Sequence, residues 1–112
     1  MSLTANSPII QEALRVWHEA GRAEFKQRYQ NLDYDSPDYT KTAKERKKYI
    51  ALDRGTSGAF LVDKETGDVY AIKGYGVAGR RVMHIDEWAP FWRKSHDDNP
   101  YQLIYVRGLN RR

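Results

Sequence analysis

Glycines and cations are concentrated between residues 73 and 81, where the chain reads KGYGVAGRR. Three glycines within six residues let neighbouring backbone amides converge on one point, and the flanking lysine and arginines add positive charge. This chemistry suits a phosphate or another anion, although a solvated turn between two strands would have the same composition. The residues of this candidate anion-binding turn are Lys73, Gly74, Tyr75, Gly76, Gly79, Arg80 and Arg81.

A second candidate binding segment carries five cations within eight residues, which repel one another unless solvent or a polyanion offsets their charge. Residues 41–81 hold ten basic and five acidic side chains, whereas the whole chain has a net charge of +4. This asymmetry predicts a basic central surface for a nucleic acid or another phosphate-bearing ligand, with a solvated face as the alternative. Tyr39, Tyr49 and Tyr75 would supply faces on which bases stack, unless they are half-buried in the core. The cations of this segment are Lys41, Lys44, Arg46, Lys47 and Lys48.

Three known motifs match the glycine-rich turn in part. Gly74, Gly76 and Gly79 have the spacing of the dinucleotide fingerprint, but no helix-forming sequence follows them. KGYG matches the first half of an RNA-recognition signature, whereas Val77 and Arg80 stand where its further aromatic residues belong. GVAG resembles the loop of KH domains, which joins two helices rather than two strands. The anion-binding prediction therefore depends on the chemistry of the turn and not on a complete motif.

Catalytic and metal-binding patterns are missing from the sequence. His84, Asp86, His96 and Asp98 have no diagnostic metal-ligand spacing, and no serine or threonine stands in a nucleophile elbow. The chain has no cysteine, which excludes thiolate ligands and disulfides. We therefore expect no catalytic residues, no metal and no cofactor, with a hydrolase or nuclease as a minor alternative.

The elements that would position these residues follow from start signals and periodicity. Apolar residues recur every three or four positions after Ser7-Pro8 and predict a long amphipathic helix over 8–31. Ser36-Pro37 repeats the start signal and predicts a short basic helix over 37–48. Strands are expected at 49–52, 59–62, 69–72, 81–85 and 102–107, with Gly67 closing a four-residue hairpin loop. This order predicts an α+β fold with a mainly antiparallel four- to five-stranded sheet, in one domain over 1–112 with flexible ends at 1–7 and 108–112.

A short aromatic helix is expected between the last two strands, and its aromatic residues lie at steps of three and four. Packing against the sheet is one interpretation, and an exposed anchor for a host or viral protein is the other. The alternative function is therefore a protein-binding module, such as a host-factor inhibitor, a defence inhibitor or a virion component. A homodimer would form if the long helix left its apolar stripe exposed. The candidate protein-binding residues are Trp17, Trp88, Phe91 and Trp92.

Residues 54–73, RGTSGAFLVDKETGDVYAIK, resemble the start of a protein-kinase N-lobe. The resemblance implies amides between Gly55 and Gly58 over the phosphates of ATP, with Lys73 in contact with them. The chain has no His-Arg-Asp catalytic loop with its downstream Asn and no Asp-Phe-Gly, and only 39 residues follow Lys73. The segment therefore indicates a tight antiparallel meander rather than kinase activity.

Residues 48–76 also resemble small, uncharacterised proteins encoded by bacteriophages, through a Tyr-Ile strand, a Gly-Thr-Ser-Gly turn and a Thr-Gly hairpin. The resemblance implies a viral accessory protein that acts by binding, in the cytoplasm of the host cell. No apolar run approaches the roughly 20 residues of a membrane span, and the start MSLTANSP does not have the pattern of a signal peptide. We therefore expect a cytoplasmic protein without a membrane partner.

Overall fold

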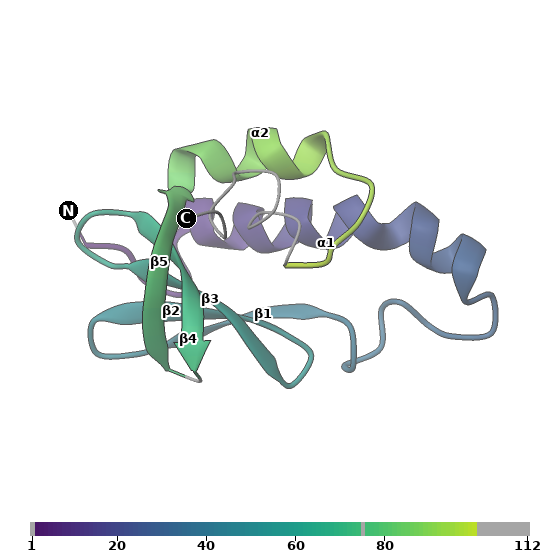
Figure 1. Cartoon of the computed structure of the whole chain (residues 1–112), viewed down its shortest axis with the longest axis horizontal. Coiled ribbons are helices and arrows are strands. Elements are labelled where there is room, and N and C mark those ends of the chain that lie inside the picture. The colour runs from purple at the N-terminus through teal and green to yellow at the C-terminus, as the bar shows by residue number, and fades with distance from the viewer. Residues whose placement is uncertain (1, 75, 101–112) are drawn as a thin grey trace.

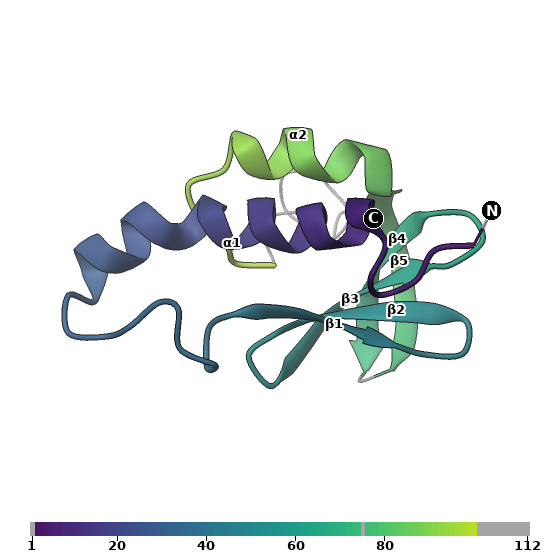
Figure 2. The same cartoon turned by 180° about the vertical axis from the view of Figure 1, so that it is seen from behind.

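Two helices lie on the same side of a five-stranded antiparallel sheet (Figures 1 and 2). The computed structural model describes residues 2–74 and 76–100. The elements are α1 (Pro8–Arg28), β1 (Lys41–Glu45), β2 (Tyr49–Arg54), β3 (Ser57–Asp63), β4 (Asp68–Gly74), β5 (Val77–His84), the 3-10 turn η1 (Ile85–Glu87) and α2 (Trp88–Arg93). The predicted α+β class and the antiparallel sheet are confirmed. The expected strand at 102–107, the tail at 108–112 and Tyr75 lie outside the described residues.

The sheet is a simple meander in the order β1-β2-β3-β4-β5. Each strand pairs antiparallel with the next through a hairpin, so β1 and β5 form its two edges. Gly67 has a φ of +79°, a conformation that favours glycine, and its N–H donates to the carbonyl oxygen of Asp63 at 2.9 Å. The predicted four-residue hairpin loop is therefore confirmed.

The predicted basic helix over 37–48 is wrong. Ser36 begins a turn instead, because its carbonyl accepts hydrogen bonds from the amides of Tyr39 and Thr40 at 3.0 and 3.2 Å. Residues 41–45 form β1, which pairs antiparallel with β2. Lys41 is buried in this strand and Thr42 is exposed. A short helix with few apolar residues gains little from packing against a core, whereas an edge strand gains hydrogen bonds to the neighbouring strand.

Helix α1 begins as predicted, with Ser7 at the N-cap and Pro8 in the first turn, but it ends at Arg28, three residues before the expected end. Tyr29 and Leu32 continue the apolar stripe in the sequence, yet they are 45% and 49% exposed. No core faces them, so helix formation gains little from burial beyond Arg28. The buried residues of α1 are Ile10, Ala13, Val16, Trp17 and Gly21.

The core between the helices and the sheet is built around three tryptophans. Trp17, Trp88 and Trp92 are fully buried, and the ring centroids of Trp17 and Trp88 lie 5.6 Å apart in an edge-to-face contact. The indole N–H of Trp88 donates to the carbonyl of Ala13 at 2.8 Å and ties α2 to α1. Phe91 packs against this core and is half-buried. The short aromatic helix is therefore confirmed, and its tryptophans have no exposed ring with which to anchor a partner.

Residues 2–7, for which we expected flexibility, run along the β1–β2 and β3–β4 hairpins. The amide of Leu3 donates to the carbonyl of Lys64 at 2.9 Å, and the amide of Ala5 donates to the Glu45 carboxylate at 2.8 Å. In the part of the chain that the structure describes, no helix is both long and apolar enough to cross a bilayer.

Candidate functional site

The two predicted basic segments lie on opposite edges of the sheet. Lys44 belongs to β1, and Lys47 and Lys48 occupy the β1–β2 turn. Lys73 and Gly74 are the last two residues of β4, and Arg80 and Arg81 lie on β5. Because three strands separate β1 from β5, the glycine-rich turn and the β1–β2 turn do not form one continuous patch.

The glycines of the predicted anion-binding turn have different roles. Gly76 has a φ of +80°, and a side chain there would meet open space, as it would at Gly74. At Gly79 an added Cβ would come within 2.9 Å of the carbonyl oxygen of Ala71. Gly79 is therefore required for the close approach of β5 to β4, and this packing explains the third glycine without a ligand.

One row of paired residues nevertheless runs across all five strands, although its two central residues, Ala51 and Leu61, are buried. We call the paired residues Lys44, Ala51, Leu61, Tyr70 and Arg81 the outer row. The neighbouring row contains Ile50, Val62, Val69 and Met83, which all belong to the core beneath the helices. Since successive side chains of a strand alternate between faces, the outer row faces away from the helices. Lys44 and Arg81 thus share one face, about 19 Å apart across four strand spacings.

Two tyrosines lie beside the centre of this face. Tyr49 is two residues before Ala51 and therefore points to the same side as the outer row. Its ring centroid is 6.1 Å from that of Tyr70 in an edge-to-face contact, and the Lys48 ammonium lies 5.5 Å from the Tyr49 ring. Both tyrosines are half-buried, so part of each ring remains open to solvent. Tyr70 is not among the residues predicted from the sequence, although the alternation of buried Val69 with its neighbours in this strand could have placed it on the outer face.

Most cations of the two basic segments have no acidic partner among the described residues. Lys44, Lys47, Lys48, Lys73 and Arg80 make no ion pair with any residue in the described ranges. Arg81 donates from Nε to the Asp68 carboxylate at 2.8 Å, and this hydrogen bond raises the pKa of Arg81 and lowers that of Asp68. The outer row therefore has a free cation at the β1 edge and a paired but half-exposed cation at the β5 edge.

One carboxylate reduces the positive charge near β1. Asp53 lies opposite Thr42, is only 6% exposed, and its Oδ1 has no hydrogen-bond partner among the described residues. Burial raises the pKa of Asp53, while the nearby charges of Lys44 and Arg46 act in the opposite direction. Arg46 is half-buried, so the exposed charge at this edge comes from the lysines.

Lys41 does not belong to the surface, contrary to the prediction that placed it in a basic binding segment. Its side chain is 1% exposed, and its ammonium donates to Asp98 Oδ2 at 2.5 Å and to the Tyr34 hydroxyl at 2.9 Å. Burial lowers the pKa of Lys41 to about 8, although the hydrogen bond with Asp98 acts to raise it. Lys41 is therefore a structural cation, fixed behind the sheet edge and unable to reach a ligand.

Asp98 is the centre of this buried cluster. It also accepts a hydrogen bond from Arg54 Nε at 2.8 Å, and its side chain is 6% exposed. Burial raises the pKa of Asp98, but hydrogen bonds from Arg54 and Lys41 outweigh burial and hold this pKa at about 2. We name Lys41, Arg54, Asp98 and Tyr34 the buried ion cluster. No local pattern in the sequence signals it, because Asp98 lies 57 residues from Lys41.

The histidines and acids considered as metal ligands do not gather. Among residues 2–74 and 76–100, no group of three or more potential ligands has a geometry that could hold a metal ion. His84 instead accepts a hydrogen bond from the amide of Asp86 at 3.1 Å and caps η1. Asp98 is occupied by Lys41 and Arg54.

Comparisons with protein-family models, with curated proteins and with solved structures find no match to this chain. The relationship to small bacteriophage proteins therefore stays a prediction.

Proposed function

We propose that this protein is a non-enzymatic binding protein that holds single-stranded nucleic acid on the outer face of its sheet. The observation that carries the proposal is the outer row, in which Lys44 and Arg81 flank the partly open rings of Tyr49 and Tyr70. The cations would contact phosphates, and the rings would stack on bases. This mixture is the one that sequence-independent binders of single strands use.

The geometry favours a single strand over a duplex. Base stacking on an aromatic ring requires an unpaired base, because the faces of paired bases are covered by their neighbours. A strand that runs from the β1 edge to the β5 edge would pass both tyrosines and meet one cation at each end. Lys47 and Lys48 in the β1–β2 turn extend the positive charge beyond Lys44. Each stacked base is expected to contribute about 1–3 kcal/mol.

Fluorescence anisotropy with labelled oligothymidine and a labelled duplex, at about 50 and 200 mM salt, tests the proposal. Binding to the single strand should weaken steeply with salt, because each neutralised phosphate releases counterions. The double substitution of Lys44→Gln and Arg81→Gln should reduce the slope of log K against log salt by about 1.4, which is the value for two phosphate contacts on a single strand. Replacing Tyr49 and Tyr70 by leucine should weaken binding with little change in this slope.

Arg15→Gln with Arg93→Gln is the matched control, since both arginines pair with Glu12 on the helical side. It removes the same formal charge from the opposite side of the molecule and should leave binding within about twofold. Equal losses in both double variants, or no binding at 50 mM salt, would contradict the proposal. In the second case an acidic protein surface would be the next partner to test.

A further inference from the structure

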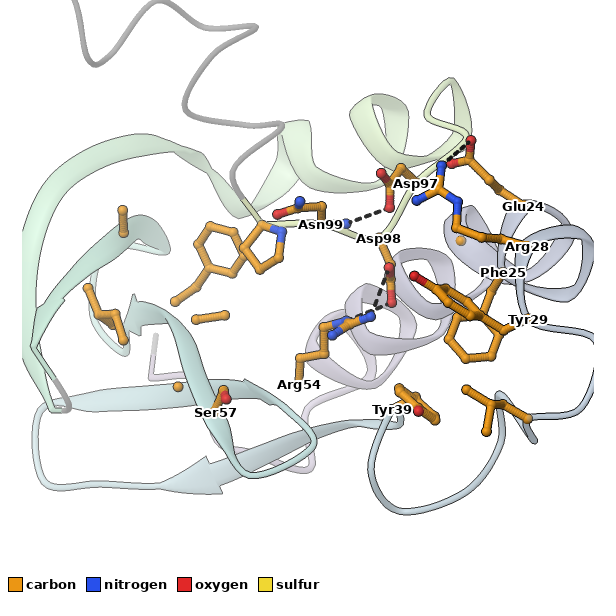
Figure 3. A pocket seen from close by; sticks show the side chains of 18 residues that line it. Glu24, Phe25, Arg28, Tyr29, Tyr39, Arg54, Ser57, Asp97, Asp98 and Asn99 are labelled. Carbon is orange, nitrogen blue, oxygen red and sulfur yellow. Dashed lines mark hydrogen bonds and ion pairs between the residues drawn. The ribbon is translucent and has the colours of Figure 1, made fainter.

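A pocket of about 740 Å³ lies on the helical side of the sheet and is separate from the outer row (Figure 3). Its walls come from the C-terminal half of α1, from β2, β3 and β4, and from residues 97–100. None of the five outer-row residues lines it. The volume is within the range of about 300–1,000 Å³ that small organic ligands occupy.

Arg54 presents a fixed cation to this pocket. Its Nε donates to Asp98 Oδ2 at 2.8 Å and its Nη2 donates to Oδ1 at 3.4 Å, which orients the plane of the guanidinium (Figure 3). The ring of Tyr39 lies 5.9 Å from the guanidinium carbon and supports it from another side. Nη1 makes no hydrogen bond with any described residue, and the side chain is 32% exposed. A pre-oriented donor group therefore remains available to a ligand.

The charges of the buried ion cluster do not balance. One carboxylate, that of Asp98, accepts hydrogen bonds from two cations, Lys41 and Arg54. Lys41 is enclosed, so the excess positive charge is accessible only at Arg54. Two further carboxylates line the pocket: the charge of Asp97 acts on Arg54, and Glu24 pairs with Arg28 at 3.6 Å. Neither accepts a hydrogen bond from Arg54. An anionic group beside Arg54 would give this guanidinium a second acceptor, which offsets the cost of removing the anion from water.

Apolar and aromatic side chains surround the cation. Phe25, Tyr29 and Leu32 line the pocket on the α1 side, and Phe60 and Pro100 line it on the sheet side. Tyr29 and Leu32 are among the few large apolar side chains that are more than a third exposed in the described residues. Convergence of an oriented cation with aromatic walls is the usual form of a site for a small amphipathic ligand.

We infer that this pocket binds a small organic monoanion with a flat aromatic body, whose anionic head lies on Arg54 and whose body lies between the aromatic walls. The head supplies the charge that the cluster lacks, and the body covers the exposed rings. This site is independent of the outer row, and a ligand here would not compete with nucleic acid for the same residues.

The experiment uses two fluorescent probes with nearly the same body. 8-Anilinonaphthalene-1-sulfonate carries one negative charge, and N-phenyl-1-naphthylamine is its neutral counterpart. On the unmodified chain the sulfonate should bind at least about tenfold more tightly, since a charge-assisted hydrogen bond outweighs the greater apolar character of the neutral probe. Equal affinities, or tighter binding of the neutral probe, would overturn the inference without any variant.

Arg54→Gln should weaken binding of the sulfonate by about tenfold or more while changing the affinity of the neutral probe by less than about twofold. Arg15→Gln is the matched control, because Arg15 lines neither the pocket nor the outer row, and this variant should leave both affinities unchanged. Far-ultraviolet circular dichroism verifies that the Arg54→Gln variant folds. Equal weakening of both probes, or the same loss in the Arg15→Gln variant, would refute the role of Arg54.

Discussion

Replacement of Asp98 by Asn should show how strongly the buried ion cluster holds the fold together. The pKa of Asp98 falls from its usual 3.8 to about 2 in the folded protein. This difference corresponds to about 2.5 kcal/mol of stability at pH 7. An Asn at this position keeps the shape of the side chain but loses the charge, and its amide group would face the donors of Arg54 and Tyr34. A loss of this size would lower the melting temperature by about 10 °C in a domain of this length.

The dependence on pH separates charge from shape. A carboxylate whose pKa is lower in the folded state stabilises that state above its unfolded pKa, and this stabilisation is lost as pH falls through the folded pKa. The difference between the unmodified chain and Asp98→Asn should therefore shrink from about 2.5 kcal/mol at pH 7 to about 1.3 kcal/mol at pH 3. Urea denaturation at both pH values measures it.

Asp97→Asn is the matched control, because it neutralises the adjacent residue and an Asn oxygen can still accept the hydrogen bond from the amide of Asn99. Its cost should stay below about 1 kcal/mol at both pH values. If Asp98→Asn costs the same at pH 3 as at pH 7, the carboxylate charge does not stabilise the fold. The loss would then come from altered packing alone.

Two further substitutions probe the fold at single positions. Burial lowers the pKa of His18, so the unfolded chain takes up a proton at a higher pH than the folded protein does, and stability falls as pH drops below about 6.5. His18→Gln should flatten the loss of stability between pH 7 and 5 in urea titrations, and an unchanged slope would exclude this role. Gly79→Ala should cost about 1–3 kcal/mol, because its Cβ would come within 2.9 Å of the Ala71 carbonyl oxygen. Gly74→Ala has no such neighbour and is its control in thermal unfolding, so equal melting temperatures would contradict the packing argument.

The proposed binding face was only partly predictable from the sequence. The prediction included Lys44 and Arg81 because cations cluster visibly around them. It missed Tyr70 and included Lys41, since neither partner nor burial can be read from neighbouring residues. Only the pairing of five strands places Lys44 and Arg81 in one row, although they are 37 residues apart in the sequence.

Local features of the sequence determined the start of α1, the hairpin at Gly67, the positions of β2 to β5 and the short aromatic helix. These elements depend on signals within a few residues, such as a proline in a first turn, a glycine with positive φ and the period of apolar residues. At two places the tertiary structure overrode these local signals. Ser36-Pro37 is followed by a strand because β2 offers backbone partners to residues 41–45, and Lys41 is buried because Asp98 lies opposite it. A charged side chain can be buried only beside a compensating charge, and here that charge comes from a residue 57 positions away.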